Sequence, residues 1–349
     1  MFLSRIPHAL FIIIAVVAVT LFLEQILDMK DDAKPYIRLQ KGTEYFVAVS
    51  PAKYDYPDYA HSIVVLFERT APEEWKKIGH QLLDPRWDTQ GIAVIEDKLF
   101  LMHHNHKKTA PVTVHNINQF FEVAPEKKFD ARPLATIRNI RNSVALESNN
   151  GGKICITFMS HGDTSRGIHI YDYDALMSGK NNPELTINLE NIDGKGHSPS
   201  DCVFYKKNLI VSNHYRGDIS ILDISKTPPT IKRIPTGKDT GLYYPLGMAV
   251  HDDLLYVADH IHYYISVFDL SDLDNVRLVR TFGGINSGLQ MPYHLAIYDN
   301  MLFAANLQPP QSISAYALDA KDSVTPRFVI TKSKETLLNA PSDVHIFRY

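Results

Sequence analysis

Three short runs of alternating apolar and polar residues lie close together in residues 244–272, at 246–250, 254–258 and 265–268. Turns rich in Asp and His separate them. Alternation over so few residues is typical of strands with one buried face. A sheet of three such strands cannot cover its own apolar surface, so it needs neighbours of the same kind. The stretch therefore predicts a repeating all-β structure.

The same pattern returns along the chain. Residues 198–223 and 291–318 repeat it closely, and residues 89–116 and 143–172 repeat it more loosely. The third strand of each repeat begins about 46–56 residues after the previous one, which is the spacing of propeller blades built from four strands. These strands begin at Ile63, Val112, Ile168, Ile219, Ile265 and Ile313.

The two ends of the chain complete one another. The tail at 340–349 (APSDVHIFRY) is an innermost strand with no successor, whereas residues 44–49 and 62–67 are second and third strands with no innermost strand before them. Joining them closes the ring and removes exposed sheet edges. The predicted fold is therefore an all-β, six-bladed β-propeller closed by N- and C-terminal strands in one blade.

The other five blades are predicted at about 89–121, 131–174, 184–223, 230–269 and 277–318, with candidate outer strands at 75–83 and 327–331. Patterns with a helical period are scarce. We therefore expect no helix outside the apolar N-terminal segment.

That N-terminal segment differs from the rest of the chain. Residues 9–23 (ALFIIIAVVAVTLFL) are apolar apart from Thr20, which is marginal for crossing a bilayer and also fits a signal-peptide core. No Ala-x-Ala-like site follows, and Arg5 favours a cytoplasmic N-terminus. We expect a signal anchor or signal peptide at 1–29, a tether at 30–42 and a propeller at 43–349. The propeller would then lie outside the cytoplasm, membrane-anchored or, if the segment is cleaved, secreted.

Charge and cysteine content narrow the choices. The chain has 36 basic and 39 acidic residues and no long basic run, so we expect no nucleic-acid partner. Its two cysteines, Cys155 and Cys202, each lie in an apolar strand. They are either two small buried side chains or, in an oxidising compartment, a disulfide between the second strand of one blade and the first of the next.

The second strands end in polar residues that can be aligned as FLMHH, TFMSH, IVSNH, YVADH, FAANL and FVAVS. In a propeller, the loop after the second strand and the start of the innermost strand share one face. The sequence therefore predicts a channel mouth lined by imidazoles and carboxylates. The final positions of the alignment are His104, His161, His214, His260, Leu307 and Ser50, and the innermost strands add Gln90, Ser200, Asp201, Tyr293, His294, Ser342 and Asp343.

Imidazoles and carboxylates bind Zn²⁺ or Ca²⁺, or act as acid and base near neutral pH. Each residue also has a structural alternative: a His copied with the repeat caps a turn, and an Asp such as Asp201, Asp259 or Asp343 bonds backbone N–H groups. The candidates are His161 and His214 for catalysis, Asp201, His260 and His294 as metal ligands, and His104, Asn213, Asp259, Asn306 and Tyr293 for ligand binding.

Two family resemblances rest on these residues. PLGMAVHDDLLYVADHIHYYISVFDL, at 245–270, resembles an NHL-type repeat. Behind its N-terminal anchor the six-bladed chain also resembles the paraoxonase/arylesterase group: Pro199-Ser200-Asp201 and Ser212-Asn213-His214-Tyr215 are similar to its strand-start and turn motifs, and His161 lies where it has a functional His.

The second resemblance implies a Ca²⁺ ion in the channel, held by Asn, Asp and Glu at the starts of the innermost strands. Here Gln90, Ser200, Leu246, Tyr293 and His294 stand at the matching positions, and Asp201 alone is retained. Leu246 has no side-chain atom that can ligate a metal.

Two functions remain open. In the first, a membrane-tethered propeller binds a small-molecule ligand or a partner protein through its loop-rich, His-rich channel face. Long loops at 51–59, 103–111 and 307–311 favour this function, because binding surfaces concentrate on loops over rigid scaffolds. In the second, the chain is a metal-dependent hydrolase or lyase of the arylesterase or lactonase type, with its site at the channel mouth.

Overall fold

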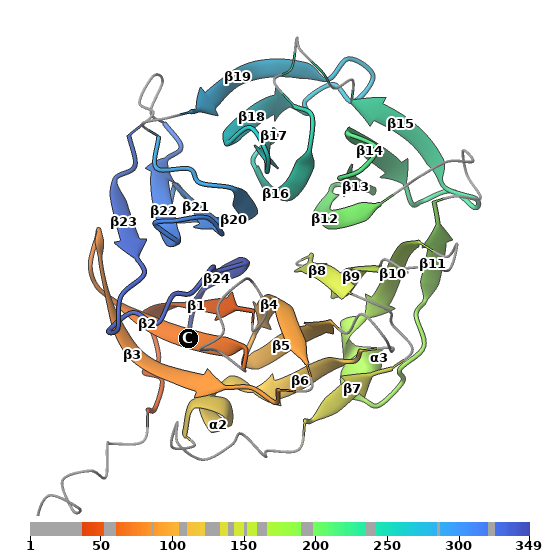
Figure 1. Ribbon diagram of the computed structural model, residues 1–349. Helices are drawn as coiled ribbons and strands as arrows, with labels where there is room; N and C mark the ends of the chain where they lie inside the picture. Colours follow the sequence, from red (N-terminus) through yellow and green to blue (C-terminus); the bar gives the residue numbers. More distant parts are fainter. Residues whose placement is uncertain are drawn as a thin grey trace, which may run out of the picture. The chain divides into compact units, whose positions relative to one another are not determined.

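Six four-stranded antiparallel sheets form a ring in the computed structural model (Figure 1). The structure describes residues 37–51, 61–85, 87–104, 110–122, 133–138, 143–149, 152–158, 166–189, 198–234, 237, 240, 242–284, 287–319 and 325–349. Each sheet is one blade, and each inner strand contacts the inner strand of the next blade until the ring closes. The predicted all-β, six-bladed propeller is confirmed.

One sheet joins the two ends of the chain. This closing blade has the order β24-β1-β2-β3, and the last strand pairs with the first from Glu44↔Arg348 to Val49↔Asp343. The predicted closure by the C-terminal tail is therefore confirmed. Its strands are β24 (Asp343–Arg348), β1 (Glu44–Ser50), β2 (Ile63–Ala71) and β3 (Glu74–Leu82).

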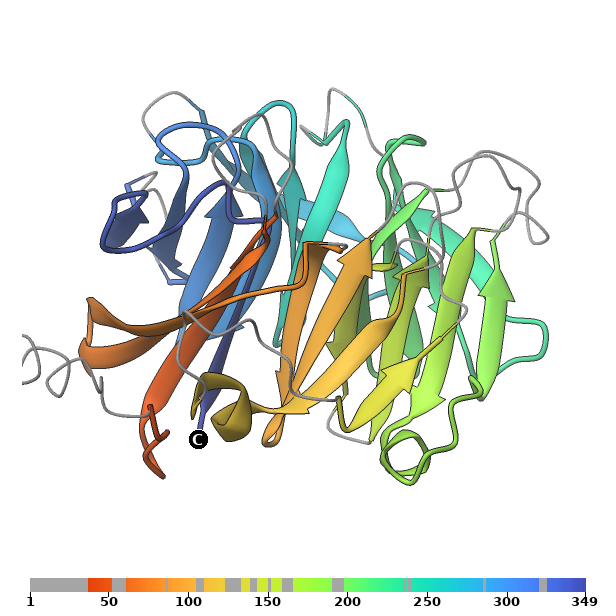
Figure 2. The ribbon, with the colours of Figure 1, turned by 60° about the horizontal axis from the view of Figure 1, so that its bottom comes forward.

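The other blades follow in chain order from the inner to the outer strand, and Figure 2 shows several from the side. Blade 1 is β4 (Asp88–Ile95), β5 (Lys98–His104), β6 (Val112–Asn116) and β7 (Ala135–Ile137). Blade 2 is β8 (Ser143–Ser148), β9 (Lys153–Phe158), β10 (Gly167–Asp172) and β11 (Leu185–Asn188). Blade 3 is β12 (Pro199–Tyr205), β13 (Asn208–Asn213), β14 (Asp218–Asp223) and β15 (Thr230–Ile234). Blade 4 is β16 (Pro245–His251), β17 (Leu254–Asp259), β18 (Tyr264–Asp269) and β19 (Arg277–Gly283). Blade 5 is β20 (Pro292–Tyr298), β21 (Met301–Asn306), β22 (Ser312–Ala317) and β23 (Phe328–Thr331).

The predicted blade boundaries are displaced by one strand. The sequence assigned residues 131–137, 184–188, 230–234 and 277–283 to the start of the following blade, but each of these segments contains the outer strand of the preceding blade. Each outer strand pairs antiparallel with the third strand directly before it, as β15 does with β14. Local antiparallel pairing therefore sets the boundary at the crossing from an outer strand to the next inner strand.

The expectation of no further helix is wrong. Two short helices follow third strands, α2 (Ile117–Glu122) and α3 (Tyr173–Met177). Asp172 caps the second, because its carboxylate accepts a hydrogen bond from the backbone N–H of Ala175 at 2.8 Å. One turn and a half is too short to show a helical period in the sequence.

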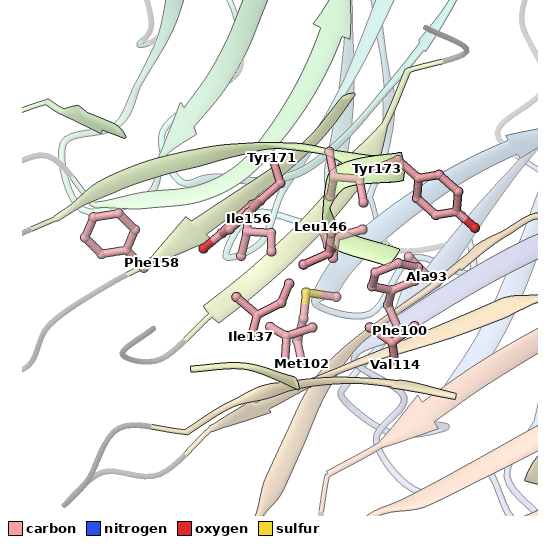
Figure 3. Close-up of a cluster of buried hydrophobic side chains, with 13 residues drawn as sticks. Ala93, Phe100, Met102, Val114, Ile137, Leu146, Ile156, Phe158, Tyr171 and Tyr173 are labelled. Atoms are coloured by element: carbon pink, nitrogen blue, oxygen red, sulfur yellow. The ribbon is translucent and has the colours of Figure 1, made fainter. Parts of the chain in front are cut away.

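The core lies between the blades rather than in one central mass. Figure 3 shows Phe100 and Met102 of blade 1 facing Leu146 and Ile156 of blade 2, within a cluster of buried side chains. Similar clusters lie between blades 2 and 3, 3 and 4, and 4 and 5, and between blade 5 and the closing blade. Since a blade packs on both of its faces, second strands such as β13 are buried throughout, which explains their continuous apolar runs.

A disulfide joins Cys155 of β9 to Cys202 of β12, so the second of the two alternatives for the cysteines is the one observed. It links the second strand of blade 2 to the inner strand of blade 3.

None of the helices in the described part of the chain is long and apolar enough to cross a membrane. The predicted anchor at 1–29 lies outside the described residues, as does most of the tether.

Candidate functional site at the channel mouth

In each of four blades, the start of the inner strand pairs with the end of the second strand. Pro199 pairs with Asn213, Pro245 with Asp259 and Pro292 with Asn306, and Asp88 pairs with His104 in the same way. These strand ends therefore share one face of the ring, as predicted. We call it the channel face.

Near the channel face, β-bulges interrupt the pairing of the inner strands. The register shifts between Pro199 and Asp201 in β12 and between Pro292 and His294 in β20, and similar shifts occur in β4, β8 and β16. A bulge bends the strand locally and redirects its side chains. Asp201 and His294 both lie directly after such a shift.

Four side chains meet where the inner strands converge, and we call them the axial cluster: Glu147, Asp201, His294 and Asp343. His294 lies between the other three. Its Nδ1 is 2.5 Å from Oδ1 of Asp343, and its Nε2 is 3.9 Å from Oδ2 of Asp201 and 4.0 Å from Oε1 of Glu147. These four residues come from blades 5, 3, 2 and the closing blade, so the cluster exists only in the closed ring.

The two aspartates are held in the same way. Asp201 accepts the backbone N–H of Cys202 at 2.7 Å and, across to blade 4, that of Met248 at 2.6 Å. Asp343 accepts the N–H of Val344 at 2.7 Å and, across to blade 1, that of Ile92 at 2.8 Å. The predicted alternative, that these aspartates bond backbone N–H groups, is therefore observed for both.

The cluster retains protons at neutral pH. Burial by itself lowers the pKa of His294, but the charges of Asp343, Asp201 and Glu147 outweigh it and raise the pKa to about 10. Desolvation, followed by repulsion from Asp201, raises the pKa of Glu147 to about 8. Burial likewise raises the pKa of Asp201 to about 6. At neutral pH the cluster therefore contains a charged imidazolium, and the Glu147 carboxyl is largely protonated.

As they lie, these groups do not fit a metal ion. Ca²⁺ needs six to eight oxygen ligands and Zn²⁺ needs free lone pairs on its donors. Here the aspartate oxygens accept backbone N–H groups, and the His294 ring fills the space between the carboxylates. No group of three or more His, Cys, Asp or Glu in the described ranges has the geometry to hold a metal. The Ca²⁺ or Zn²⁺ ion stays a prediction.

The third predicted metal ligand, His260, lies in a separate group. Its ring centroid is 5.7 Å from that of His214 and 5.5 Å from that of Tyr293. The ring centroid of His214 lies in turn 4.9 Å from that of Tyr215 and 5.8 Å from that of Tyr244. We call this group, together with Tyr243 and His262, the tyrosine–histidine patch.

The patch is partly open to solvent, and two of its imidazoles are uncharged. Tyr215 is 69% exposed, and Tyr243 and Tyr244 are about two-fifths exposed, at 41% and 38%. Burial, followed by the charge of His214, lowers the pKa of His260 to about 4. Burial also lowers the pKa of His214. Both imidazoles are therefore neutral at pH 7 and can donate or accept hydrogen bonds.

The repeated histidines also connect neighbouring blades. Nδ1 of His260, after β17, lies 3.4 Å from the carbonyl of Pro292 in blade 5. His214, at the equivalent position of blade 3, lies near the backbone of Pro245 in blade 4. A contact between neighbouring blades is therefore a structural explanation for the histidine at this position of the repeat.

Three of the predicted ligand-binding residues hold turns and strands through their side chains. Asn213 donates to Asp218 and Ser220 at 2.8 and 3.0 Å. Asp259 accepts backbone N–H groups from residues 243, 244, 261 and 262. Asn306 donates to Ser314 and accepts from Gln290. A role for them in ligand binding stays a prediction.

The predicted alignment of four histidines holds for three. The predicted third-strand starts Val112, Ile219 and Ile265 pair with Met102, Ser212 and Ala258. Two positions after these partners come His104, His214 and His260. In β9 the corresponding partner is Thr157, so the equivalent position is 159 and His161 falls two residues beyond it. By the same register, Ser50 is equivalent to Ser212. The alignment was wrong at these two positions because it followed residue types rather than strand pairing.

His161 itself lies outside the described residues. His104 is buried at the end of β5. The two ring nitrogens of its neighbour His103 form hydrogen bonds with the hydroxyl groups of Thr89 and Thr113, each at 2.8 Å.

Two members of the axial cluster were not among the predicted site residues. Asp343 shares the Pro-Ser-Asp triplet with Asp201 and was placed at the channel mouth, so that triplet was a usable signal. Glu147 has no comparable signal, because a register shift between Ser143 and Leu146 places it.

Comparison with known proteins supports the fold. No family model matches the chain, and no curated protein matches its sequence. A chain of a nidogen/laminin complex superposes with a TM-score of 0.57 at 12% identity, covering 87% of this chain and 98% of that one. A putative 6-phosphogluconolactonase from Bacteroides uniformis superposes at 0.55 and 10% identity, covering 88% and 100%. The periplasmic gluconolactonase PpgL of Pseudomonas aeruginosa superposes at 0.55 and 11% identity, covering 87% and 85%. At these identities the likeness shows the propeller fold alone.

Proposed function

We propose that this propeller binds a small uncharged ligand with a flat apolar face, such as a sugar ring, at the tyrosine–histidine patch of its channel face. The observation that supports this proposal best is the exposure of Tyr215, Tyr243 and Tyr244 around the half-buried imidazole of His214 and the buried imidazole of His260. Tyrosine combines an apolar ring face with a polar hydroxyl, which suits a ligand that is itself apolar on one face and polar at its rim.

Charge favours a neutral ligand over an anionic one. The imidazoles of His214 and His260 are neutral, because burial lowers their pKa values. The basic side chain in the adjoining turn, Arg216, forms an ion pair with Asp218 at 2.6 Å. Among the described residues of the patch and this turn, a phosphate or carboxylate group would therefore find no cationic side chain that lacks a carboxylate partner.

The location outside the cytoplasm is part of this proposal. The apolar run at 9–23 supports export or anchoring. The Cys155–Cys202 disulfide supports an oxidising compartment, because such bonds are rare in the cytosol. A partner protein remains the alternative occupant of the same face.

A lactone hydrolase is the second candidate function. Glu147 in the axial cluster favours it, because its raised pKa of about 8 leaves it protonated and able to donate a proton at neutral pH, while neutral His214 has the state required of a base. One structural neighbour is described as a putative 6-phosphogluconolactonase and another as a periplasmic gluconolactonase, so a sugar lactone is the first substrate to test. His161 and His214 remain the candidate catalytic residues, and a metal-dependent route stays a proposal.

One experiment tests both functions. The purified protein is titrated with a panel of neutral monosaccharides and oligosaccharides and their lactones by calorimetry, and lactone turnover is followed in parallel. We expect saturable binding of a neutral member that Tyr244→Ala and Tyr215→Ala weaken. His251→Ala is the control for surface changes, because this partly exposed imidazole lies at the opposite end of β16.

Binding without turnover supports the first function, and turnover lost in Glu147→Gln and His214→Ala supports the second. If no neutral ligand bound, or if the tyrosine variants bound as well as the unaltered protein, the proposed site would be wrong.

A further inference from the structure

We propose that the imidazole of His294 is the axial cation of this propeller, occupying the channel position that a metal ion fills in the group it resembles. The family resemblance implies a metal ion in the channel, but the residues around His294 do not fit one. This disagreement leads to the inference. Its consequence is that removing the His294 side chain uncovers a three-carboxylate site able to hold a divalent cation.

The geometry around the ring supports a cation there. Both ring nitrogens face carboxylates: Nδ1 lies 2.5 Å from Asp343, and Nε2 lies between Asp201 at 3.9 Å and Glu147 at 4.0 Å. A neutral imidazole has one N–H, whereas an imidazolium has an N–H on each ring nitrogen and so presents positive charge to the carboxylates on both sides. The ring therefore takes the place of a positive charge shared among three blades.

Hydrogen bonds from the remaining blades to the two aspartates extend this network. Asp343 accepts the N–H of Ile92 on β4, and Asp201 accepts that of Met248 on β16. Together with Glu147 on β8 and His294 on β20, the network reaches the inner strands of all six blades. A bound metal ion would connect the same strands in the same way.

The backbone that carries His294 packs closely against β16, and its side chain is nearly enclosed. Gly247 of β16 lies so close that a Cβ at its position would be 2.5 Å from Cα of His294 and 2.6 Å from the carbonyl oxygen of Tyr293. The His294 side chain is only 9% exposed. A metal ion and the ring would therefore compete for one space.

The test compares the unaltered full chain with His294→Asn after treatment with EDTA. Asn removes the positive charge and supplies an oxygen, so three carboxylates would face a vacant position. We expect the melting temperature of His294→Asn to fall, and then to rise with CaCl₂ concentration as binding to the folded state requires. The melting temperature of the unaltered protein should not respond to CaCl₂. His260→Asn, which changes a channel-face histidine outside the axial cluster, should not respond either.

Two further variants locate the effect. His294→Asn combined with Asp201→Asn should lose the CaCl₂ response, because it removes one of the three carboxylates. His294→Lys, which keeps a cation, should show no response.

The inference is overturned if the unaltered protein holds stoichiometric metal that Asp201→Asn releases. It is also overturned if His294→Asn keeps its full stability or shows no CaCl₂ response. If His294→Asn does not fold without metal, refolding in CaCl₂ supports the inference and failure to refold contradicts it. These outcomes are independent of ligand binding at the tyrosine–histidine patch.

Discussion

Asp201 and Asp343 lie three blades apart around the ring and make the same pair of hydrogen bonds. Each follows Pro-Ser, each accepts the N–H of the next residue at 2.7 Å, and each accepts an N–H from the following blade, at 2.6 Å for Asp201 and 2.8 Å for Asp343. His294 lies against both. These hydrogen bonds connect blade 3 to blade 4 and the closing blade to blade 1, on opposite sides of the ring. The imidazole of His294 therefore links the two connections.

Replacing either aspartate should destabilise the fold. Asp201→Asn and Asp343→Asn keep the shape but remove the charge that faces His294 and turn one acceptor into a donor. Breaking one partner of a buried ion pair costs about 3–5 kcal/mol. Urea unfolding followed by far-UV circular dichroism measures the change. Asp252→Asn, at an exposed turn position with φ of 52° that Asn also adopts, should be near neutral. Equal midpoints for all three variants would contradict the role of the axial cluster.

Stability should fall as pH rises above neutral. The pKa of His294 is raised from 6.5 to about 10 and that of Glu147 from 4.5 to about 8, so the folded protein binds more protons than the unfolded chain up to those values. The stability due to His294 is fully present below its unfolded pKa and is lost as pH approaches 10. Each unit of such a shift corresponds to about 1.4 kcal/mol. Below pH 6.5 the trend is opposed by His260 and His345, whose pKa values burial lowers to about 4.

Urea midpoints measured from neutral to alkaline pH test this dependence. His294→Leu should remove the upper part of the decline, towards pH 10, and His251→Leu should retain it. A stability that stays level from neutral pH to pH 10 would show that the axial cluster does not hold the extra protons.

Reducing the disulfide should weaken the contact between blades 2 and 3. Cys155 and Cys202 are 47 residues apart, and closing a loop of this size typically contributes about 2–4 kcal/mol. We expect a lower urea midpoint in the presence of dithiothreitol, and the double variant Cys155→Ser/Cys202→Ser should have the same lower midpoint under both conditions. Mass spectrometry after alkylation without reduction should find no free thiol. Two alkylated cysteines in the purified, unreduced protein would contradict the pairing.

Gly247→Ala should be more harmful than an alanine at an exposed glycine. The added Cβ would meet backbone atoms of Tyr293 and His294 at 2.5–2.6 Å, and backbone cannot move aside as a side chain can. Gly179→Ala is the matched control, because it has a φ of +91° but open space around it, and a left-handed φ costs a non-glycine residue about 1–2 kcal/mol. We expect a larger loss for Gly247→Ala in thermal unfolding. A smaller loss would mean that β16 and β20 separate easily.

The candidate site was only partly foreseeable. The shared channel face followed from strand direction, and Asp201 and His294 were correctly expected near one another because both start inner strands. His260 was grouped with them by residue type alone, whereas its ring packs against His214 and Tyr293. Glu147 was missed, because a register shift within β8 moves side chains in a way that an alternating pattern does not reveal.

The sequence by itself determined the number of blades and the closure of the ring. Both depend on local alternation, on a regular spacing of hairpins, and on a tail that lacks a partner anywhere but at the first strands. Tertiary structure alone decided which side chains meet at the axis and how they are charged. Glu147, Asp201, His294 and Asp343 come from four different blades, and their contacts and pKa values arise only when the closed ring and its bulges bring them together and remove water from around them.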